Sequence, residues 1–386
     1  MNKIFKKIVF MILIILSIHS NAVSEEIKLK IGVLVPMSGN NSELGQLIIK
    51  AVRLAIKDID ANKLEIYPKD TASDPTQALN SAKEFKQMGI NIIIGPIFHK
   101  SLIYLDEVED LTFISLTNKT IDLPKNVISA GVNASSQLEA IKKFIELNKI
   151  KKTIFLTPKL NYEAEINKAI KQSKIKISKH HFYDTEPTKL TKQIEKITNY
   201  KIRKQNVTYE IKRIENSDIS EADKERRINK LKKRYTLGNL NFDSVIISDF
   251  DESLKSVITS LLYTDVIPKK KYFITFNQWF DESLINERTL QPLYYPSINK
   301  NNLENFTQKF ENIFNEKPNH LALLSYDLVG LIYYLSLKNN LSDANELFKN
   351  KNTFKGKIGI FNISNNKINH KLNFYQINDG KLKEIF

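Results

Sequence analysis

The chain has 386 residues, 42% of them hydrophobic and 26% charged, which is enough for a large core and favours more than one domain. It contains no cysteine, which excludes disulfides, thiol catalysis and zinc ribbons. The formal net charge is +15, and this excess of lysine is either a solvated surface or a means of attraction to peptidoglycan, lipid head groups or an acidic partner.

The first 22 residues have the pattern of a secretory signal peptide. A lysine-rich start is followed by an apolar run from Ile8 to Ile18 and by small residues that end at Ala22. We expect cleavage after Ala22; the alternative is an uncleaved anchor, for which the run is short. No other stretch is expected to cross a bilayer. Because no cysteine is present for lipid attachment, the mature chain is predicted to be soluble in the periplasm, without stable membrane insertion.

A strand, a polar turn and a helix follow. Residues 29–35 form an apolar run of strand length, and residues 44–59 carry apolar side chains at the spacing of a helix face. Between them lies a polar turn that contains Ser38 and Gly39, and Asn40 is predicted to cap the helix. We expect this turn to present free backbone amides and to grip either a bound molecule or the opposite half of the protein.

The alternation of strands and helices continues to about residue 280. Asp74 and Pro75 mark the start of a second helix, and Gly89 marks its end. Further strands are predicted at 63–68, 91–94, 111–116, 126–130, 151–157, 178–184, 244–250 and 271–277, and further helices at 136–148 and 163–173. This order predicts two α/β lobes in series, each built on a parallel sheet that is covered by helices.

Two later segments differ from this alternation. The tail from residue 354 alternates like strands, with turns at Asn365-Asn366 and near Gly380, and is predicted to form hairpins on an edge of one lobe. Residues 201–235 are highly charged and net basic, and their two halves flank an Asn-Ser-Asp turn. They are predicted to form a helical hairpin inserted in the second lobe. It is either a solvated excursion or a docking arm, and the sequence does not separate the two.

Motifs for catalysis are missing from the sequence. It has no glycine-rich phosphate loop, no GxSxG and no HExxH. His180 and His181 are neighbours on a predicted strand, so their rings point to opposite faces and would not share a metal. We therefore predict a protein that is not an enzyme, with no catalytic residue, no metal, no cofactor and no nucleic-acid partner.

Polar residues follow the predicted strands. In open parallel sheets, ligands bind beyond the carboxyl ends of the strands, where helix N-termini leave backbone N–H groups free. The candidate ligand-binding residues there are Ser38, Gly39, Phe98, Ser101, Ser115, Thr117, Asn118, Tyr162, Asp249, Asn277 and Trp279, the last being the only tryptophan. Each one could be an ordinary helix cap, but as a set on one edge of the sheets they predict a binding cleft.

Several segments resemble the type I periplasmic binding proteins of the leucine-binding kind. They are 31–59, 70–98, 113–118 and 321–335, which contain the turn after the first strand, "IIIGP" and "SYD". The resemblance implies an α/β fold of two Rossmann-like lobes with parallel sheets, joined by a three-stranded hinge. The chain is then expected to cross between lobes near 130–133, near 293–296 and between 337 and 354. Lobe 1 would comprise 27–132 plus 297–338, and lobe 2 would comprise 133–295 plus 339–386.

Within that family, "FDSVIISDF" and "YFITFNQWFDE" are similar to the penicillin-binding protein activator branch. This favours a regulator of peptidoglycan synthesis, with a penicillin-binding protein as its partner. The alternative is a solute-binding component of an ABC importer for amino acids or related small polar ligands, with a permease as its partner. In that case Ser101 and Thr117 would hold the carboxylate, and Tyr162 or Trp279 would cover the side chain. The ammonium group would need a buried acid, for which Asp249 is the candidate.

Overall fold

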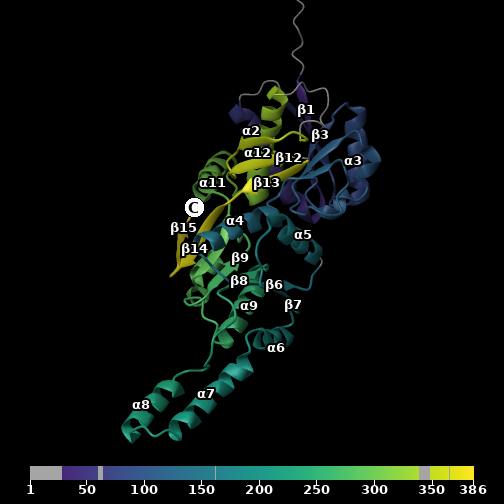
Figure 1. The fold of residues 1–386 in the computed structure, drawn as a ribbon. Helices are drawn as coiled ribbons and strands as arrows, with labels where there is room; N and C mark the ends of the chain where they lie inside the picture. The colour runs from purple at the N-terminus through teal and green to yellow at the C-terminus, as the bar shows by residue number, and fades with distance from the viewer. Residues whose placement is uncertain (1–27, 60–63, 161, 339–347, 365) are drawn as a thin grey trace, which may run out of the picture.

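A computed structural model describes residues 28–59, 64–160, 162–338, 348–364 and 366–386. The predicted signal peptide lies outside the described residues. The described chain forms two α/β lobes, and a helical arm projects from the far end of the second one (Figure 1). This is the α/β architecture that the sequence predicts.

The first lobe is built on a five-stranded sheet in the order β2-β1-β3-β4-β5 with all strands parallel. Its strands are β1 (Leu29–Val35), β2 (Leu64–Asp70), β3 (Ile92–Ile94), β4 (Thr112–Ser115) and β5 (Val127–Ser129). Alternate residues of β1 pack on opposite faces: Ile31 and Val33 join the cluster around α2 (Ser42–Ile59), and Leu34 joins the cluster around α3 (Pro75–Gln87). Both faces are therefore covered by helices, which explains the unbroken apolar strands.

The second lobe contains a seven-stranded sheet in the order β15-β14-β10-β9-β8-β6-β7. Its parallel strands are β6 (Thr153–Pro158), β7 (Lys179–Tyr183), β8 (Ser244–Ile247), β9 (Tyr272–Thr275) and β10 (Leu293–Ser297), and β14 (Asn373–Asn378) and β15 (Lys381–Glu384) are antiparallel. The helices of this part of the chain are α4 (Ala134–Leu147), α5 (Glu163–Ser173), α6 (Pro187–Ile197), α9 (Asp251–Tyr263) and α10 (Glu282–Asn286). The tail hairpin β14–β15 extends this sheet at one edge, as the alternation and the turn before Gly380 predict.

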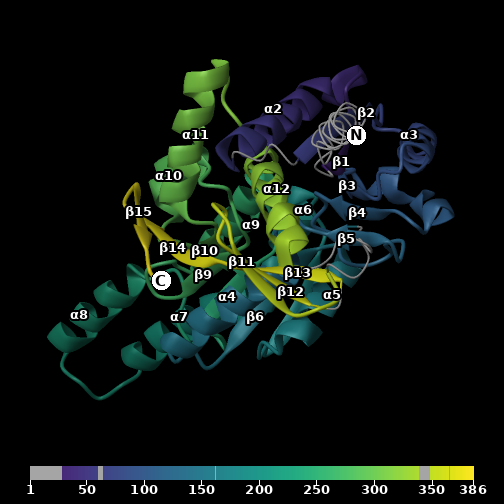
Figure 2. The same cartoon turned by 90° about the horizontal axis from the view of Figure 1, so that it is seen from above.

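A third, three-stranded sheet consists of β11 (Asn352–Lys355), β12 (Ile360–Ser364) and β13 (Lys367–Lys371). It pairs with neither large sheet, and Figure 2 shows it beside α12 (His320–Lys338). Asp327 of α12 joins the two, because its carboxylate accepts the backbone N–H groups of Lys357 at 2.8 Å and Ile358 at 2.6 Å. The expectation assigned all of 339–386 to lobe 2, but in the described part of that range the strands that belong to the second sheet are β14 and β15, between residues 373 and 384.

Helix α12 is long and apolar enough to cross a membrane by length and composition, and it is the one such helix among the described residues. This differs from the expectation that no stretch beyond the N-terminus would pass that test. In the structure 56% of its most apolar window is buried, and it packs beside α2. A helix that is apolar on all sides is typical of a protein core, and α12 has that position here.

The sequence predicts an N-cap residue for two helices, and the structure confirms one of these predictions and contradicts the other. Asp74 caps α3 by accepting the backbone N–H of Gln77 at 2.9 Å, and Pro75 is its first residue, as predicted. The predicted cap at Asn40 is wrong: Asn40 lies inside a 3-10 turn, and α2 begins only at Ser42. The reason is tertiary, since the turn is drawn toward β2 by contacts described below.

The charged insert forms the predicted helical hairpin. Helix α7 (Tyr200–Glu215) and helix α8 (Glu221–Lys232) contact each other and extend away from the second lobe (Figure 1). Helix α11 (Lys300–Phe314) packs beside α12, with the ring centroids of Phe306 and Tyr326 5.4 Å apart, and forms an ion pair with α2 between Lys309 and Asp58 at 2.6 Å.

Candidate functional site

A cavity of about 360 Å³ lies between the two lobes, at the carboxyl ends of their strands. Its lining comes from the segments after β3, β4 and β5, from the segments after β8 and β9, from α4, from the start of α12 and from Ile358 between β11 and β12. The lining residues are Ile97, Phe98, His99, Leu116, Thr117, Asn118, Lys119, Gly131, Val132, Gln137, Phe250, Asn277, Trp279, His320, Leu321, Leu324 and Ile358. Both sheets therefore open onto one site, at the edge where doubly wound folds bind ligands.

A larger hollow of about 640 Å³ exists elsewhere in the second lobe, but it lies at the opposite strand edge. Its lining includes Ser178 and Lys179 at the start of β7 and Ile154 near the start of β6. Amino ends of parallel strands present no helix N-termini, so we place the candidate site in the smaller cavity between the lobes.

Five of the predicted ligand-binding residues line this cavity: Phe98, Thr117, Asn118, Asn277 and Trp279. They lie in the segments that follow β3 and β4 of the first lobe and β9 of the second. The tertiary structure thus brings together residues that are up to about 180 positions apart in sequence, because parallel strands end at one edge.

Asn277 is fixed by its neighbours. Its side-chain Oδ1 accepts the backbone N–H of Trp279 at 2.9 Å and the hydroxyl of Ser297 at 2.8 Å. Its backbone N–H donates to Oε1 of Gln137 at 2.7 Å. The side chain is only 2% exposed, and its Nδ2 has no hydrogen-bond partner within the described chain. Asn277 therefore brings an unused buried donor to the lining of the cavity.

Trp279 reaches across the lobes to His320, at the start of α12. The two rings are stacked, with centroids 4.1 Å apart and planes 16° from parallel. Both Trp279 and the next residue, Phe280, have left-handed backbone angles, with φ of 49° and 60°. Such angles are uncommon for aromatic residues and mark a conformation that the surroundings impose. Burial lowers the pKa of His320 to about 4, so the ring is neutral at pH 7.

The first turn is placed elsewhere. Asp70, at the end of β2, accepts the backbone N–H of Met37 at 2.6 Å and the hydroxyl of Ser38 at 2.5 Å. Gly45 lets α2 approach this turn, because a Cβ on Gly45 would lie 1.7 Å from the carbonyl oxygen of Pro36. Ser38 and Gly39 therefore do not line the cavity, and the N–H of Met37, at the start of the turn, is bonded within the first lobe.

Three other predicted residues, all with hydroxyl groups, are also outside the lining. Ser101 and Ser115 are fully buried; the Ser115 hydroxyl donates to the carbonyl of Pro96 at 2.7 Å, and the Ser101 hydroxyl has no partner within the described chain. Tyr162 donates its hydroxyl to the carbonyl of Ser248 at 3.0 Å, inside the second lobe. These hydroxyls contribute to packing around the strand ends rather than to the cavity surface.

Asp249, the candidate partner for an ammonium group, is used by the protein itself. Its carboxylate accepts the hydroxyls of Tyr183 at 2.5 Å and Ser253 at 2.6 Å, and the backbone N–H of Phe250 at 2.9 Å. Burial, together with the charge of Asp249, raises the pKa of Tyr183. Asp281, the other nearby acid, caps α10 by accepting from Ser283. No Asp or Glu is among the residues that line the cavity.

Further contacts join the lobes beside the cavity. Glu165 of α5 is 7% exposed and accepts the backbone N–H of Thr120 at 2.8 Å and the hydroxyl of the same residue. Lys168, one turn later, donates to the carbonyl of Thr120 at 2.7 Å. With the Trp279–His320 stack, these bonds connect the two lobes.

Sequence reasoning missed His99, Lys119, Gln137, Phe250 and His320. Three of them directly follow residues that were selected, so strand-end position could have found His99, Lys119 and Phe250. Gln137 lies on α4 and was hidden by its helical pattern. His320 had no local signal, because only the packing of α12 between the lobes brings it to Trp279.

Comparison with known proteins agrees with this geometry. Residues 28–202 match the family model described as periplasmic binding protein. No curated protein matches the chain at a significant level.

Three solved structures share the fold. The C-domain of LpoA (YraM) from Haemophilus influenzae, a regulator of PBP1A, is 13% identical with a TM-score of 0.62, over 92% of this chain and 100% of that one. LivJ from Streptococcus pneumoniae in complex with isoleucine is 16% identical with a TM-score of 0.53, over 92% and 98%. A solute binding protein of an ABC transporter from Rhodopseudomonas palustris, in complex with 3,4-dihydroxybenzoic acid, is 17% identical with a TM-score of 0.55, over 93% and 96%.

These identities are low, so the structures establish the fold and leave the ligand and the partner open. The family match covers the first lobe and the start of the second, and the structural matches extend over the rest. The chain is therefore a protein of the type I periplasmic binding protein fold, with two α/β lobes that enclose a cavity at their strand ends.

Proposed function

We propose that this chain is an exported, non-enzymatic regulator of peptidoglycan synthesis that acts by docking on a penicillin-binding protein in the periplasm. The similarity in fold to the C-domain of LpoA supports this role, since that protein is a regulator of PBP1A. The observation that carries the proposal is the helical arm formed by α7 and α8, which is rigidly rooted, exposed and basic.

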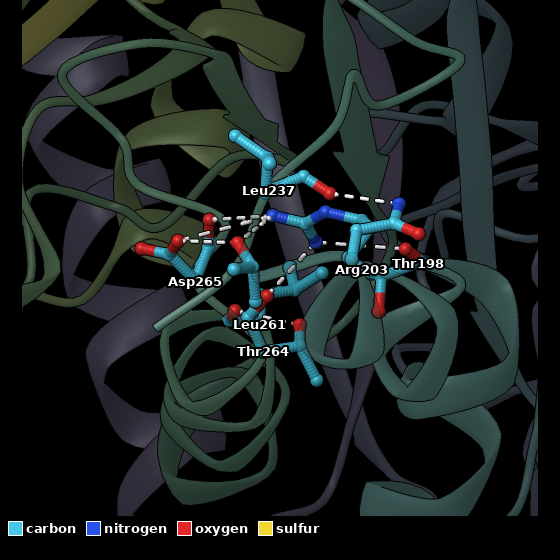
Figure 3. A network of polar contacts seen from close by, with 8 residues as sticks. Thr198, Arg203, Leu237, Leu261, Thr264 and Asp265 are labelled. Atoms are coloured by element: carbon cyan, nitrogen blue, oxygen red, sulfur yellow. Dashed lines mark hydrogen bonds and ion pairs between the residues drawn. The ribbon is translucent and has the colours of Figure 1, made fainter. Parts of the chain in front are cut away.

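The base of the arm is fixed by the polar contacts of Arg203 (Figure 3). The residue is 6% exposed. Its guanidinium donates to the carbonyl of Thr264 at 3.0 Å and to the hydroxyl of Thr236 at 2.7 Å, and lies 3.9 Å from the carboxylate of Asp265. Thr236 in turn donates to Asp265 at 2.6 Å. A buried, multiply bonded guanidinium of this kind holds both ends of the hairpin against the lobe, so the arm projects in a defined direction.

The arm carries more positively charged side chains than acidic side chains that could pair with them. Residues 200–235 contain twelve Lys or Arg and six Asp or Glu. Three ion pairs, Arg213–Glu210, Lys224–Glu221 and Arg226–Asp223, each lie within one helix. In the described chain, no ion pair joins the other exposed cations of the arm to a carboxylate: Lys201, Lys204, Lys212, Arg227, Lys230, Lys232, Lys233 and Arg234.

Exposed apolar side chains accompany these charges. Ile202 is 58% exposed, Tyr209 is 64% exposed and Tyr235 is 79% exposed. Tyrosines and arginines are the residues that most often anchor protein interfaces, and unpaired cations steer an acidic partner toward them. This combination of residues favours a hairpin that docks on an acidic protein surface over a hairpin that contacts only solvent.

The test is binding of the mature chain to the purified penicillin-binding protein encoded in the same genome, measured by biolayer interferometry. We expect binding, and we expect the triple variant Lys212→Glu, Arg227→Glu and Lys230→Glu to weaken it at least about tenfold. The control is the triple variant Lys57→Glu, Lys100→Glu and Lys151→Glu, which changes the net charge equally but lies outside the arm. Equal loss in both variants, or no binding by the parent, would refute a docking role for the arm.

A second candidate function is solute binding for an ABC importer, as in the proteins with isoleucine and 3,4-dihydroxybenzoic acid. The cavity between the lobes favours it, because a buried donor remains unused there. An amino acid fits less well, since Asp249 and Asp281 are bonded within the protein. Thermal unfolding with a panel of the common amino acids tests this point: no shift supports the regulator, and a shift of several degrees for one of them supports import.

A further inference from the structure

The lining of the cavity between the lobes has an unusual balance of donors and acceptors. The Oδ1 atom of Asn277 must face the backbone N–H of Trp279, because that N–H group can only donate. This fixes the orientation of the amide and leaves Nδ2 as a donor without an acceptor in the described chain. A donor on a side chain that is only 2% exposed is unfavourable unless something accepts from it.

A second unused group lies on the other lobe. The Nε2 atom of His99, after β3, is buried and has no hydrogen-bond partner within the described chain. The cationic side chain of Lys119, after β4, lines the same cavity, and none of the ion pairs in the described chain involves it. The cavity is thus lined by Asn277 and His99, which each carry an unpaired buried nitrogen and come one from each lobe, and by the cation Lys119 of the first lobe, while no Asp or Glu is among its lining residues.

The rest of the lining is apolar and aromatic. Phe98, Phe250 and Trp279 line the cavity, and so do the aliphatic residues Leu321 and Leu324 of α12. A volume of about 360 Å³ is within the range of small-molecule sites, which is roughly 300–1,000 Å³.

From this arrangement we infer that the cavity binds a small organic carboxylate with an aromatic or branched apolar body and no ammonium group. The carboxylate oxygens accept from Nδ2 of Asn277, from His99 and from Lys119. The body lies among the aromatic rings. An α-ammonium group would be buried without a carboxylate, which is costly. The inference concerns the cavity alone and does not depend on the role of the arm.

The sole tryptophan provides a direct measurement, because Trp279 lines the cavity. The purified chain is titrated with 3-phenylpropionate, with L-phenylalanine, which adds only the α-ammonium, and with phenethylamine, which lacks the carboxylate. We expect 3-phenylpropionate to change the fluorescence and raise the Tm, and to bind at least about tenfold more tightly than L-phenylalanine. We expect phenethylamine to cause no change.

Asn277→Asp tests the donor itself. One carboxylate oxygen of the new Asp can keep the bonds to Trp279 and Ser297. The other oxygen takes the place of Nδ2, so a donor is exchanged for a negatively charged acceptor. The affinity for 3-phenylpropionate should fall about tenfold or more, and phenethylamine should now bind. Asn229→Asp on the exposed surface of α8 makes the same chemical change away from the cavity and should leave both results unchanged.

A further variant protects the test if Asn277→Asp fails to fold. Lys119→Gln should weaken 3-phenylpropionate binding several-fold, whereas the exposed Lys151→Gln should not. The inference is overturned if 3-phenylpropionate gives no signal up to about 10 mM, if L-phenylalanine binds as tightly, or if both cavity variants bind like the parent. These results are read separately from docking on a penicillin-binding protein, so failure of one proposal leaves the other intact.

Discussion

Two turns of this protein follow parallel strands and carry similar polar residues, yet they have different surroundings. The turn after β1, with Ser38 and Gly39, meets the carboxylate of Asp70 on the neighbouring strand. In the turn after β9, the hydrogen bonds that the described residues make to Asn277 and Trp279 involve no carboxylate, and the Nδ2 donor of Asn277 stays unpaired. The polar groups that follow a strand are thus available to a ligand only when no side chain of the adjacent strand is already hydrogen-bonded to them.

The largest effect is expected where the first turn touches its helix. Gly45→Ala would place a methyl group 1.7 Å from the carbonyl oxygen of Pro36. Because this oxygen belongs to the backbone, it cannot move aside as easily as the end of a flexible side chain. We expect a loss of about 3 kcal/mol or more in the free energy of unfolding, measured by urea denaturation. A loss below about 1 kcal/mol would show that the turn moves freely and is not held as described.

Removing the carboxylate would make the first turn resemble the second. Asp70→Ala leaves the donors of Met37 and Ser38 without their partner, and we expect a loss of about 2 kcal/mol in urea denaturation. Ligand-induced fluorescence of Trp279 should be unchanged, since this turn is outside the cavity. A changed ligand response would contradict the separation of the two turns.

The carboxylate of Asp70 also makes the free energy of unfolding depend on pH. Burial opposes its charge, but hydrogen bonds from the turn outweigh burial and hold the pKa of Asp70 below its usual 3.8. Because the folded pKa is depressed, the stability from Asp70 is present above the unfolded pKa and is lost as the pH falls through the folded one. Acid unfolding of Asp70→Ala should therefore be less steep below pH 4 than that of the parent.

The second turn has its own pH dependence, through His320. Burial lowers its pKa to about 4 from the usual 6.5, so the unfolded chain binds the proton more readily than the folded one between these values. The corresponding stability is present above pH 6.5 and is lost as the pH falls toward 4, and about 2 kcal/mol of it is lost by pH 5. Urea denaturation at pH 7.5 and 5 should show this loss, and His320→Phe should reduce it while keeping an aromatic ring against Trp279. An equal loss in both proteins would assign the effect to other groups.

The smallest effect is expected at Gly39. Its φ of 73° is left-handed, but no atom lies within 4 Å of a Cβ built there. Gly39→Ala should therefore cost only about 1 kcal/mol in urea denaturation, from backbone strain alone. The difference from Gly45→Ala separates strain from collision within one turn.

Much of the fold followed from local patterns. Apolar runs of strand length, helical spacing, the Asp74-Pro75 start and the charged halves of the arm predicted the order of elements, because each signal acts within a few residues. The edge of the sheets that holds the cavity also followed, since parallel strands all end there. Five of the predicted residues, among them Asn277 and Trp279, do line it.

Which polar groups at the strand ends already have a hydrogen-bond partner was decided only by the tertiary structure. Asp70 lies 32 residues after Ser38, and Asp249 lies 66 residues after Tyr183, so no local pattern showed that these carboxylates were already bonded. The placement of His320 against Trp279 and of Ile358 against α12 likewise depends on packing between distant segments. Chain periodicity reports which face of an element is buried, whereas hydrogen-bond partners across a sheet or between lobes exist only once the chain has folded.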